Sequence, residues 1–406
     1  MLVRLAKVLL LCAAFEGLCI PTHANTTATT ATTAPPQVVT TAPVLTAQTD
    51  LSIPPPTFDF PSAVPPARIA LLLPLRSETL LQAANAVRAG FMAAYERAQD
   101  SASVDVIETG DTPPDILDGY TQAAAQHDIV VGPLSRSGVA ALAQSGAVRR
   151  PTIALTQPDA PTEGELKMPP QMLVIGLSIE DEARQAANWA AADRKLAKAF
   201  VISTATAWQR RAANAFAAQW QQKGRDVQLI ELAGGGGYLE AKGLSELKGR
   251  LQSDQPALMF VALDARQARQ VRTAVGNELP MYGTSQLNPL ALIDWDTAER
   301  TTDLDGARFI DLPWQLQADD PAVMGYPRME SGASEVRSAD LERLYALGID
   351  AYRIAHEIAA NQTTFALDGV TGKLNVRFGQ GAPVFTRTEE RAVYQRGMVA
   401  PAASKR

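Results

Sequence analysis

The chain has 406 residues, of which 46% are hydrophobic and 20% charged, and its formal net charge at pH 7 is −6. A chain of this length can bury a large core, and a mildly acidic charge without a basic cluster argues against a nucleic-acid-binding protein. Cys12 and Cys19 are its only cysteines, and both lie in a stretch that we expect to be removed. Disulfide and thiol chemistry are therefore excluded from the mature chain, and no cofactor is expected.

Residues 1–24 have the features of a secretory signal peptide. Arg4 and Lys7 precede an apolar segment, and the small residues around Ala24 suit signal peptidase. An uncleaved anchor is the alternative, but the apolar run is too short to span a bilayer. Leucine, rather than a small residue, precedes each cysteine, so there is no good lipobox. We predict a periplasmic protein, and an association with the outer membrane stays open.

Residues 25–66 are predicted to form a disordered linker. They consist largely of threonine, alanine and proline, and Asp50 and Asp59 are their only charges. Such a composition cannot bury enough apolar surface to offset the entropy of the chain. The segment is interpreted as a spacer, and the alternative is a tether that reaches across the cell envelope.

The stretch from Arg68 to Tyr95 predicts a strand, a short turn and a helix. Ile69 to Leu73 is an uninterrupted apolar run, which suits a strand covered on both faces of a parallel sheet. Ser77 stands where an N-cap is expected. The helical stripe after it consists of Leu81, Ala84, Val87, Phe91 and Tyr95. Ligands of open α/β sheets bind beyond the carboxyl ends of the strands, so Arg76 in the turn should lie at the rim of a cleft.

The same alternation of strand and helix continues to residue 284. Further strands are predicted at 104–107, 129–131, 151–155, 172–176, 199–202, 227–232, 258–263 and 281–284. Helices are predicted at 113–126, 135–147, 180–193, 208–223, 239–252 and 265–275. This order implies parallel sheets with right-handed crossovers, and its length implies two α/β lobes.

The last part of the chain predicts that it crosses between the lobes more than once. A strongly amphipathic helix over 340–359 is followed by two glycine-punctuated segments, 367–381 and 389–401, which are predicted to form one hairpin-type strand pair. The expected division assigns 67–178 to lobe 1, 179–282 to lobe 2, 283–362 to lobe 1 and 363–401 to lobe 2.

Several motifs in this order resemble a known family. The segments IALLLPL (69–75), IVVGPLSRSGVAAL (129–142) and RPTIALTQ (150–157) look like the type I periplasmic solute-binding proteins of the leucine-binding kind. More narrowly, IGLSIEDEARQAANWA (175–190) and DLDGARFIDLPW (303–314) resemble the C-terminal domain of the penicillin-binding protein activators, the LppC/LpoA family. The resemblance runs from about residue 68 to residue 401.

This resemblance implies an α/β chain with the type I periplasmic-binding-protein fold. In that fold, two Rossmann-like lobes with parallel sheets are joined by three crossovers around a cleft. The resemblance also implies a non-catalytic protein that contacts a class A penicillin-binding protein and so regulates peptidoglycan synthesis. The alternative function is the solute-binding receptor of an ABC transporter, which would close on an amino acid or a similar small anion.

Candidate ligand contacts in lobe 1 follow the ends of two predicted strands. Ser135, Arg136 and Ser137 begin a helix directly after a strand, where free backbone N–H groups, hydroxyls and a guanidinium would suit a carboxylate. Thr156, which ends the next strand, adds a hydroxyl. The alternative is that the serines only cap the helix and that Arg136 is solvated.

From lobe 2, Trp208 and Asp264 could meet an apolar group and an amine of the same ligand. Both follow predicted strands, as the lobe 1 candidates do. These contacts would define a small-molecule site between the lobes.

No motif predicts catalysis or a metal site. Gly234 to Gly237 lacks the Gly-Lys-Ser/Thr of a phosphate loop and is interpreted as a flexible surface loop. His127 and His356 lie far apart and are expected to be structural, while a carboxylate-only metal site stays open without a motif. Turn or cap roles are expected for Asp303, Asp305 and Asp311, and packing roles for Trp295 and Trp314.

Overall fold

The computed structural model describes residues 66–159, 166–193, 198–288, 302–329 and 338–402. The predicted signal peptide, nearly all of the predicted linker and Trp295 lie outside these ranges. The chain divides into two units, Met1–Ala63 and Val64–Arg406, and every described residue belongs to the second.

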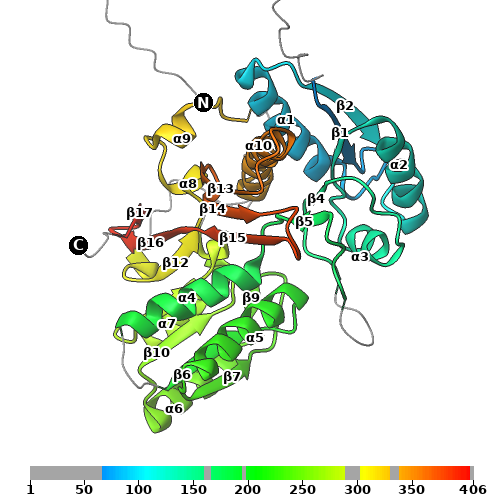
Figure 1. Cartoon of the computed structure of the whole chain (residues 1–406). Helices are drawn as coiled ribbons and strands as arrows, with labels where there is room; N and C mark the ends of the chain where they lie inside the picture. Colours follow the sequence, from blue (N-terminus) through cyan, green and yellow to red (C-terminus); the bar gives the residue numbers. More distant parts are fainter. Residues whose placement is uncertain (1–65, 160–165, 194–197, 289–301, 330–337, 403–406) are drawn as a thin grey trace, which may run out of the picture. The chain divides into compact units, whose positions relative to one another are not determined.

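A first sheet of five parallel strands forms the core of the first lobe (Figure 1). Its strands, in spatial order, are β2 (Ser103–Glu108), β1 (Arg68–Leu73), β3 (Ile129–Val131), β4 (Thr152–Ala154) and β5 (Met172–Val174). Alternate residues of β1 point to opposite faces, as the strand period requires. Leu71 lies in one apolar cluster with helices α1 (Leu81–Ala98) and α10 (Ala339–Ala359), and Leu72 lies in another with α2 (Pro113–Gln126) and α3 (Arg136–Gln144).

A second sheet of seven strands forms the core of the second lobe. Its spatial order is β17 (Met398–Pro401), β16 (Glu390–Gln395), β12 (Arg308–Asp311), β11 (Met281–Gly283), β10 (Leu258–Val261), β6 (Ala199–Ser203) and β7 (Val227–Glu231). The five strands from β12 to β7 are parallel and repeat the order of the first sheet, while β16 and β17 are antiparallel.

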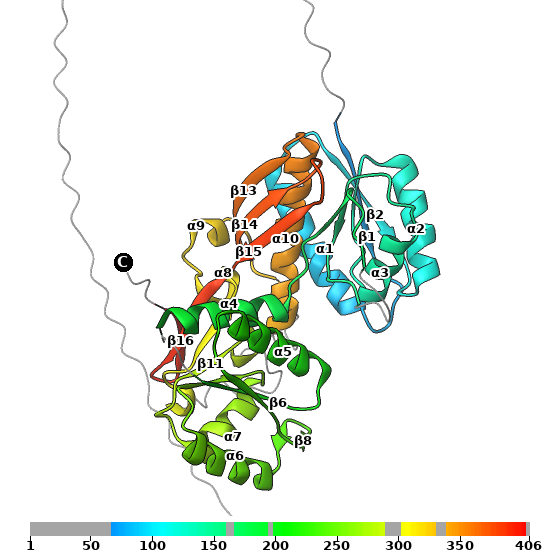
Figure 2. The same cartoon turned by 60° about the horizontal axis from the view of Figure 1, so that its bottom comes forward.

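Helices cover both faces of this second sheet (Figure 2). The helices α4 (Ile179–Asp193) and α5 (Ala207–Gln222) pack against Val201 and Phe260, on one face. On the other face, α6 (Ala241–Asp254) and α7 (Ala265–Val275) pack against Ile202 and Met259.

A third sheet, a short hairpin and several short helices complete the described part of the structure. A third sheet consists of β13 (Thr364–Gly369), β14 (Gly372–Arg377) and β15 (Val384–Thr388), all antiparallel. The predicted flexible loop at Gly234 is instead a short hairpin of β8 (Gly234–Gly235) and β9 (Tyr238–Leu239), which Gln270 binds to α7. The short helices are η1 (Ser285–Leu287), η3 (Thr302–Leu304), α8 (Pro313–Leu316) and α9 (Pro321–Met324).

The chain passes three times between the lobes. It leaves the first sheet after β5, returns after β12 to form α10 and the third sheet, and leaves again between β15 and β16. The predicted division differs from the structure at two places. Strand β12 belongs to the second sheet, and the third sheet packs its Val370 and Leu374 into the core of the first lobe. Local patterns specify a strand but not its partner, which is why both placements were missed.

The predicted pairing of 367–381 with 389–401 is wrong for the same reason. Strand β14 pairs with β13 and β15 in the third sheet, whereas β16 pairs with β12 and β17 in the second. Both segments carry glycine turns, but the turns close two separate hairpins. The chain therefore needs the third crossing between Thr388 and Glu390.

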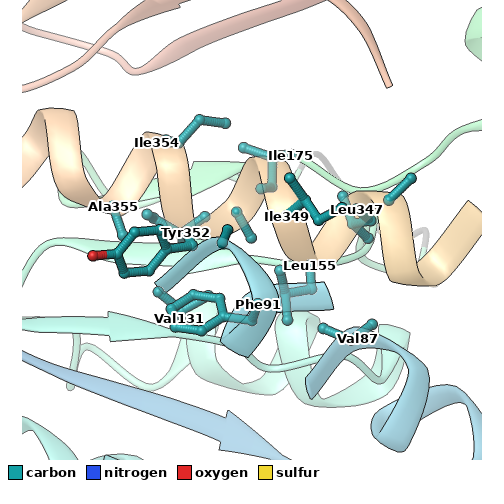
Figure 3. Close-up of a cluster of buried hydrophobic side chains, with 14 of the residues drawn as sticks. Val87, Phe91, Val131, Leu155, Ile175, Leu347, Ile349, Tyr352, Ile354 and Ala355 are labelled. Carbon is teal, nitrogen blue, oxygen red and sulfur yellow. The ribbon is translucent and has the colours of Figure 1, made fainter. Parts of the chain in front are cut away.

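The centre of the first lobe is the contact between α1 and α10, which lie side by side although they are more than 240 positions apart (Figure 3). Phe91 and Tyr352 meet edge to face, with ring centroids 5.2 Å apart. Two glycines permit the close approach of the backbones. A Cβ on Gly90 would lie 1.9 Å from the carbonyl oxygen of Tyr345, and one on Gly348 would lie 2.1 Å from that of Val87.

The start of α1 differs from its prediction. The helix begins at Leu81 after Leu80, and Ser77 is not its N-cap. Instead, the Ser77 hydroxyl donates to Asp111 Oδ2 at 2.6 Å and accepts the N–H of Leu80 at 3.1 Å. Ser77 therefore fixes the turn that precedes the helix.

Candidate functional site

The lobe 1 candidates all follow carboxyl ends of adjacent strands of the first sheet. Arg76 follows β1 with an exposed side chain, and its N–H donates to the carbonyl of Thr109 at 3.0 Å. Ser135 follows β3 as the N-cap of α3 and accepts the N–H of Gly138 at 3.2 Å. Ser137 is exposed in the first turn of α3, and Thr156 follows β4, half-buried. The structure therefore gathers these candidates at one edge of the sheet.

Arg136 is engaged within its own lobe. Its Nε donates to Asp159 Oδ1 at 2.9 Å and its Nη2 donates to the carbonyl of Pro158 at 3.0 Å. These bonds hold the start of the loop that follows β4 against α3. A ligand would have to compete with Asp159 for the guanidinium.

The lobe 2 candidates follow β6 and β10, which are neighbours in the second sheet. Trp208 is half-buried in the first turn of α5. Asp264 is the N-cap of α7, where it forms a capping box with Gln267 and accepts that residue's N–H at 2.8 Å. Burial raises the pKa of Asp264, although the bond from Gln267 acts in the opposite direction. Ser135 and Asp264 thus both have a capping role, which was the alternative considered for the serines.

The described residues contain no group of three or more His, Cys, Asp and Glu side chains that could hold a metal ion. His127 is buried and its ring bonds the Ala123 carbonyl and Asp105, each at 2.9 Å. His356 lies 3.2 Å from Asp100. Both histidines thus bridge neighbouring elements of the first lobe.

A polar cluster of buried and half-buried side chains lies where the chain passes between the lobes. We call it the crossover cluster, and it consists of Glu182, Gln185, Ser285, Asn288, Asp311, Arg343, Arg387 and Glu389. At its centre, Arg343 of α10 binds Asp311 at the end of β12 through Nε at 3.0 Å and Nη2 at 2.9 Å. Asp311 is fully buried and also accepts the Asn288 amide at 2.9 Å.

The second contact of the cluster joins α4 to the segment after β11. Glu182 accepts the Ser285 N–H at 2.7 Å and the Ser285 hydroxyl at 3.1 Å. The Ser285 carbonyl in turn accepts Arg343 Nη2 at 3.1 Å. Burial raises the pKa of Glu182 to about 7, and the charge of Asp311 acts in the same direction, whereas Ser285 and Arg343 oppose it.

The third contact joins the last crossing to the first. Arg387 at the end of β15 donates to the carbonyls of Ile175 and Gly176, at 2.7 and 3.1 Å. The N–H of Glu389 donates to Gln185 Oε1 at 3.0 Å, and its carboxylate accepts the Gln185 amide at 3.1 Å. Burial raises the pKa of Glu389 well above its usual value, and the nearby Glu182 adds to this.

The crossover cluster therefore ties all three passages of the chain together through side chains that are buried or, for Gln185 and Arg387, half-buried. Its chemistry is that of a structural joint, because its charged side chains bind each other, backbone groups or the side chains of Ser285 and Gln185. Sequence reasoning missed it. Asp311 was expected in a turn or a cap, and Arg343 and Glu182 resemble the charged residues of any amphipathic helix, which are rarely buried. The only sign of the crossover cluster in the sequence was that polar residues lie at the ends of β11 and β12.

The comparisons with known proteins agree on one family. The model of the LppC putative lipoprotein family matches residues 58–381. The penicillin-binding protein activator LpoA of Pasteurella multocida (strain Pm70) is 26% identical over 319 residues, which cover 76% of this chain and 51% of that protein. LpoA of Yersinia pseudotuberculosis serotype O:1b (strain IP 31758) is 27% identical over 417 residues, which cover 83% and 61%. The chain thus spans about half to three fifths of these relatives.

Solved structures give the same fold. A putative branched-chain amino acid ABC transporter from Chromobacterium violaceum ATCC 12472 is 33% identical with a TM-score of 0.63, covering 81% of this chain and 100% of that one. The C-domain of LpoA from Haemophilus influenzae, described as a regulator of PBP1A, is 21% identical with a TM-score of 0.61, covering 83% and 100%. The predicted type I periplasmic-binding-protein fold is confirmed. No helix among the described residues is long and apolar enough to cross a membrane.

Proposed function

The chain belongs to the LppC family, and from this premise we propose that it is a non-catalytic periplasmic protein that regulates peptidoglycan synthesis by contacting a class A penicillin-binding protein. The observation that carries the proposal is the family match over residues 58–381, together with curated relatives that are named penicillin-binding protein activators. A protein contact rather than catalysis fits a chain in which the buried charged groups of the crossover cluster are bonded to other groups of the protein, Arg343 to Asp311, Glu182 to Ser285 and Glu389 to Gln185.

The test measures binding and stimulation together. The purified protein is mixed with each class A penicillin-binding protein of its own cell, and co-purification, glycan polymerisation and peptide cross-linking are recorded. We expect binding to one synthase and faster cross-linking. A solute-binding protein of the same fold serves as the control. If the protein neither binds nor stimulates any of the synthases, the proposal is ruled out.

The location follows from the predicted signal peptide. We expect the mature chain in the periplasmic fraction to begin at Asn25, after cleavage behind Ala24. Mass spectrometry of the N-terminal peptide checks this directly. A mature N-terminus at a lipid-modified Cys12 or Cys19 would replace this proposal with a membrane-anchored protein.

A solute receptor of an ABC transporter is the second candidate. It is favoured by the 33% identity to the Chromobacterium violaceum protein, whose full length this chain covers. The ligand contacts would be Arg76, Ser135, Arg136, Ser137, Thr156, Trp208 and Asp264. Because Ser135 and Asp264 already cap helices, Ser137 and Thr156 are the more available of these polar groups.

Thermal unfolding in the presence of amino acids and cell-wall fragments separates the two candidates. A ligand at 100 times its Kd adds about 2.7 kcal/mol of stability. A receptor should respond to one compound, and Ser137→Ala should abolish the response, whereas Ser245→Ala on the exposed side of α6 should not. A melting curve that no compound moves excludes the receptor and leaves the activator proposal standing.

A further inference from the structure

Strand β7 is the open edge of the second sheet. It pairs with β6 and with no other described strand, at the end of the spatial order. The N–H of Ala199 donates to the Asp226 carbonyl at 2.9 Å, and the N–H of Leu232 donates to the Ser203 carbonyl at 2.8 Å. Backbone groups alternate in direction along a strand, so the even-numbered residues face β6. Val227, Leu229 and Glu231 therefore direct their N–H and C=O groups outward.

This edge has few of the features by which exposed strands usually avoid pairing: its one charge, Glu231 at the end of β7, forms an ion pair with Arg210 of α5. Natural edges are protected by proline, by charges within the strand or by a covering segment. The opposite edge of the same sheet, β17, ends in Pro401, and the edge strand β2 carries Asp105 bound to His127. In β7 the central residue is Leu229, which is 51% exposed.

Surface hollows lie at the two ends of β7. The first, of about 570 Å³, lies at the start of the strand and is lined by Lys198, Arg225, Val227 and Gln228, among others. The second, of about 370 Å³, lies between the end of the strand and α6 and is lined by Leu229, Glu231, Glu240 and Glu246, together with Lys242 and Arg250.

The residues whose backbone groups point outward can pair with the same residues of a second, antiparallel copy of β7. A two-fold axis at Gln228 sets Val227 of one copy opposite Leu229 of the other, twice. The same register sets Arg225 opposite Glu231, and each of them also has a partner within its own copy, the Ala191 carbonyl for Arg225 and Arg210 for Glu231. Directly opposed apolar or oppositely charged residues each stabilise a strand pair by roughly 0.2–1 kcal/mol. All these positions are odd-numbered, so they form the hydrogen-bonded pairs of the ladder.

We propose that a second copy of this chain occupies this edge, with β7 paired antiparallel to β7 about a two-fold axis at Gln228. The two second sheets then form one continuous sheet across the dimer. The interface is isologous, because both copies use the same residues. This assembly is independent of the proposed activator function, and β7 contains none of the candidate ligand contacts.

The first test is the oligomeric state of the full chain, measured by sedimentation over a wide concentration series. We expect a reversible dimer. Leu229→Pro removes an N–H that the bonds to β6 do not use, and it should weaken the dimer at least tenfold. Met398→Lys, at the opposite edge and 50% exposed in the parent chain, is the matched control and should leave the dimer unaltered. A chain that stays monomeric throughout overturns the proposal.

The second test reads the register and does not depend on the stability of a proline variant. In a background with Cys12→Ser and Cys19→Ser, Gln228→Cys should form an intermolecular disulfide on mild oxidation, because the two Cβ atoms are directly opposed. Leu229→Cys should not, since its copies are diagonal neighbours in this register. If Leu229→Cys cross-links as efficiently as Gln228→Cys, the proposed pairing is contradicted. It is also contradicted if neither variant forms the disulfide.

Discussion

Arg343 and Asp311 form a bidentate ion pair that has almost no contact with water. Arg343 is 4% exposed and Asp311 is 0% exposed. One partner lies on α10 of the first lobe and the other ends β12 of the second sheet. Because Asp311 is surrounded by protein, its charge depends on Arg343 for compensation. The pair therefore fixes the second passage of the chain between the lobes.

Arg343→Met should lower the free energy of unfolding by about 3–5 kcal/mol, since it leaves a buried carboxylate without its cation. Arg210→Met removes an exposed ion pair with Glu231 and should cost about 1 kcal/mol or less. Urea unfolding followed by circular dichroism measures both. Adding Asp311→Leu to Arg343→Met should recover much of the loss, and a single variant as stable as the control would contradict this role of the pair.

The contact of α1 with α10 gives a second prediction. Gly348→Ala should destabilise the first lobe by about 1–3 kcal/mol, because a Cβ there would lie 2.1 Å from the carbonyl oxygen of Val87. Gly249→Ala is the matched control, since this glycine lies within α6 with nothing inside 4 Å of the added Cβ. It should stabilise the chain by about 1 kcal/mol. Equal effects of the two substitutions would show that helix propensity, and not packing, determines the change in stability.

Much of the fold could be predicted because its elements are local. The bounds of α2, β3 and α7 agree with their predictions to the residue, since proline, an apolar run and a capping aspartate mark them. Strand partners could not be predicted in the same way. Val376 and Tyr394 lie in similar alternating strands, yet one is buried in the first lobe and the other in the second.

The candidate site could be predicted only in part. That Ser135 and Asp264 would each follow the carboxyl end of a strand, one in each lobe, was a consequence of the α/β alternation. The crossover cluster could not be foreseen, because burying Glu182 or Glu389 depends on three passages of the chain meeting at one place. Charged residues in helices and turns are exposed in most proteins, so their identity alone carried no information about burial.

Capping gives a third prediction, which also bears on the ligand candidates. Asp264→Ala should cost about 1 kcal/mol of stability, because α7 loses both bonds of its capping box. Ser137→Ala should change stability by less than about 0.5 kcal/mol, since Ser137 is an exposed residue outside the cap. Thermal unfolding without added ligand measures both. A costly Ser137→Ala would show that its hydroxyl holds the fold and disqualify it as a selective ligand probe.

The buried carboxyl group of Glu182 makes the stability of the chain depend on pH. Its pKa in the folded chain is about 7, so between pH 4.5 and 7 the folded chain keeps a proton that the unfolded chain releases. The free energy of unfolding should therefore fall as pH rises from 5 to 8, by at most about 3 kcal/mol for this one group. Urea unfolding at a series of pH values measures the slope.

Glu182→Gln should make that slope smaller without abolishing it, because Glu389 also has a raised pKa and acts in the same direction. Glu240→Gln, an exposed position before α6, is the control and should leave the slope unaltered. The amide can still accept the Ser285 N–H, so the variant should keep its fold. If the variant and the parent chain lose stability equally between pH 5 and 8, Glu182 is not the group that titrates, and the joint between the lobes is insensitive to its charge.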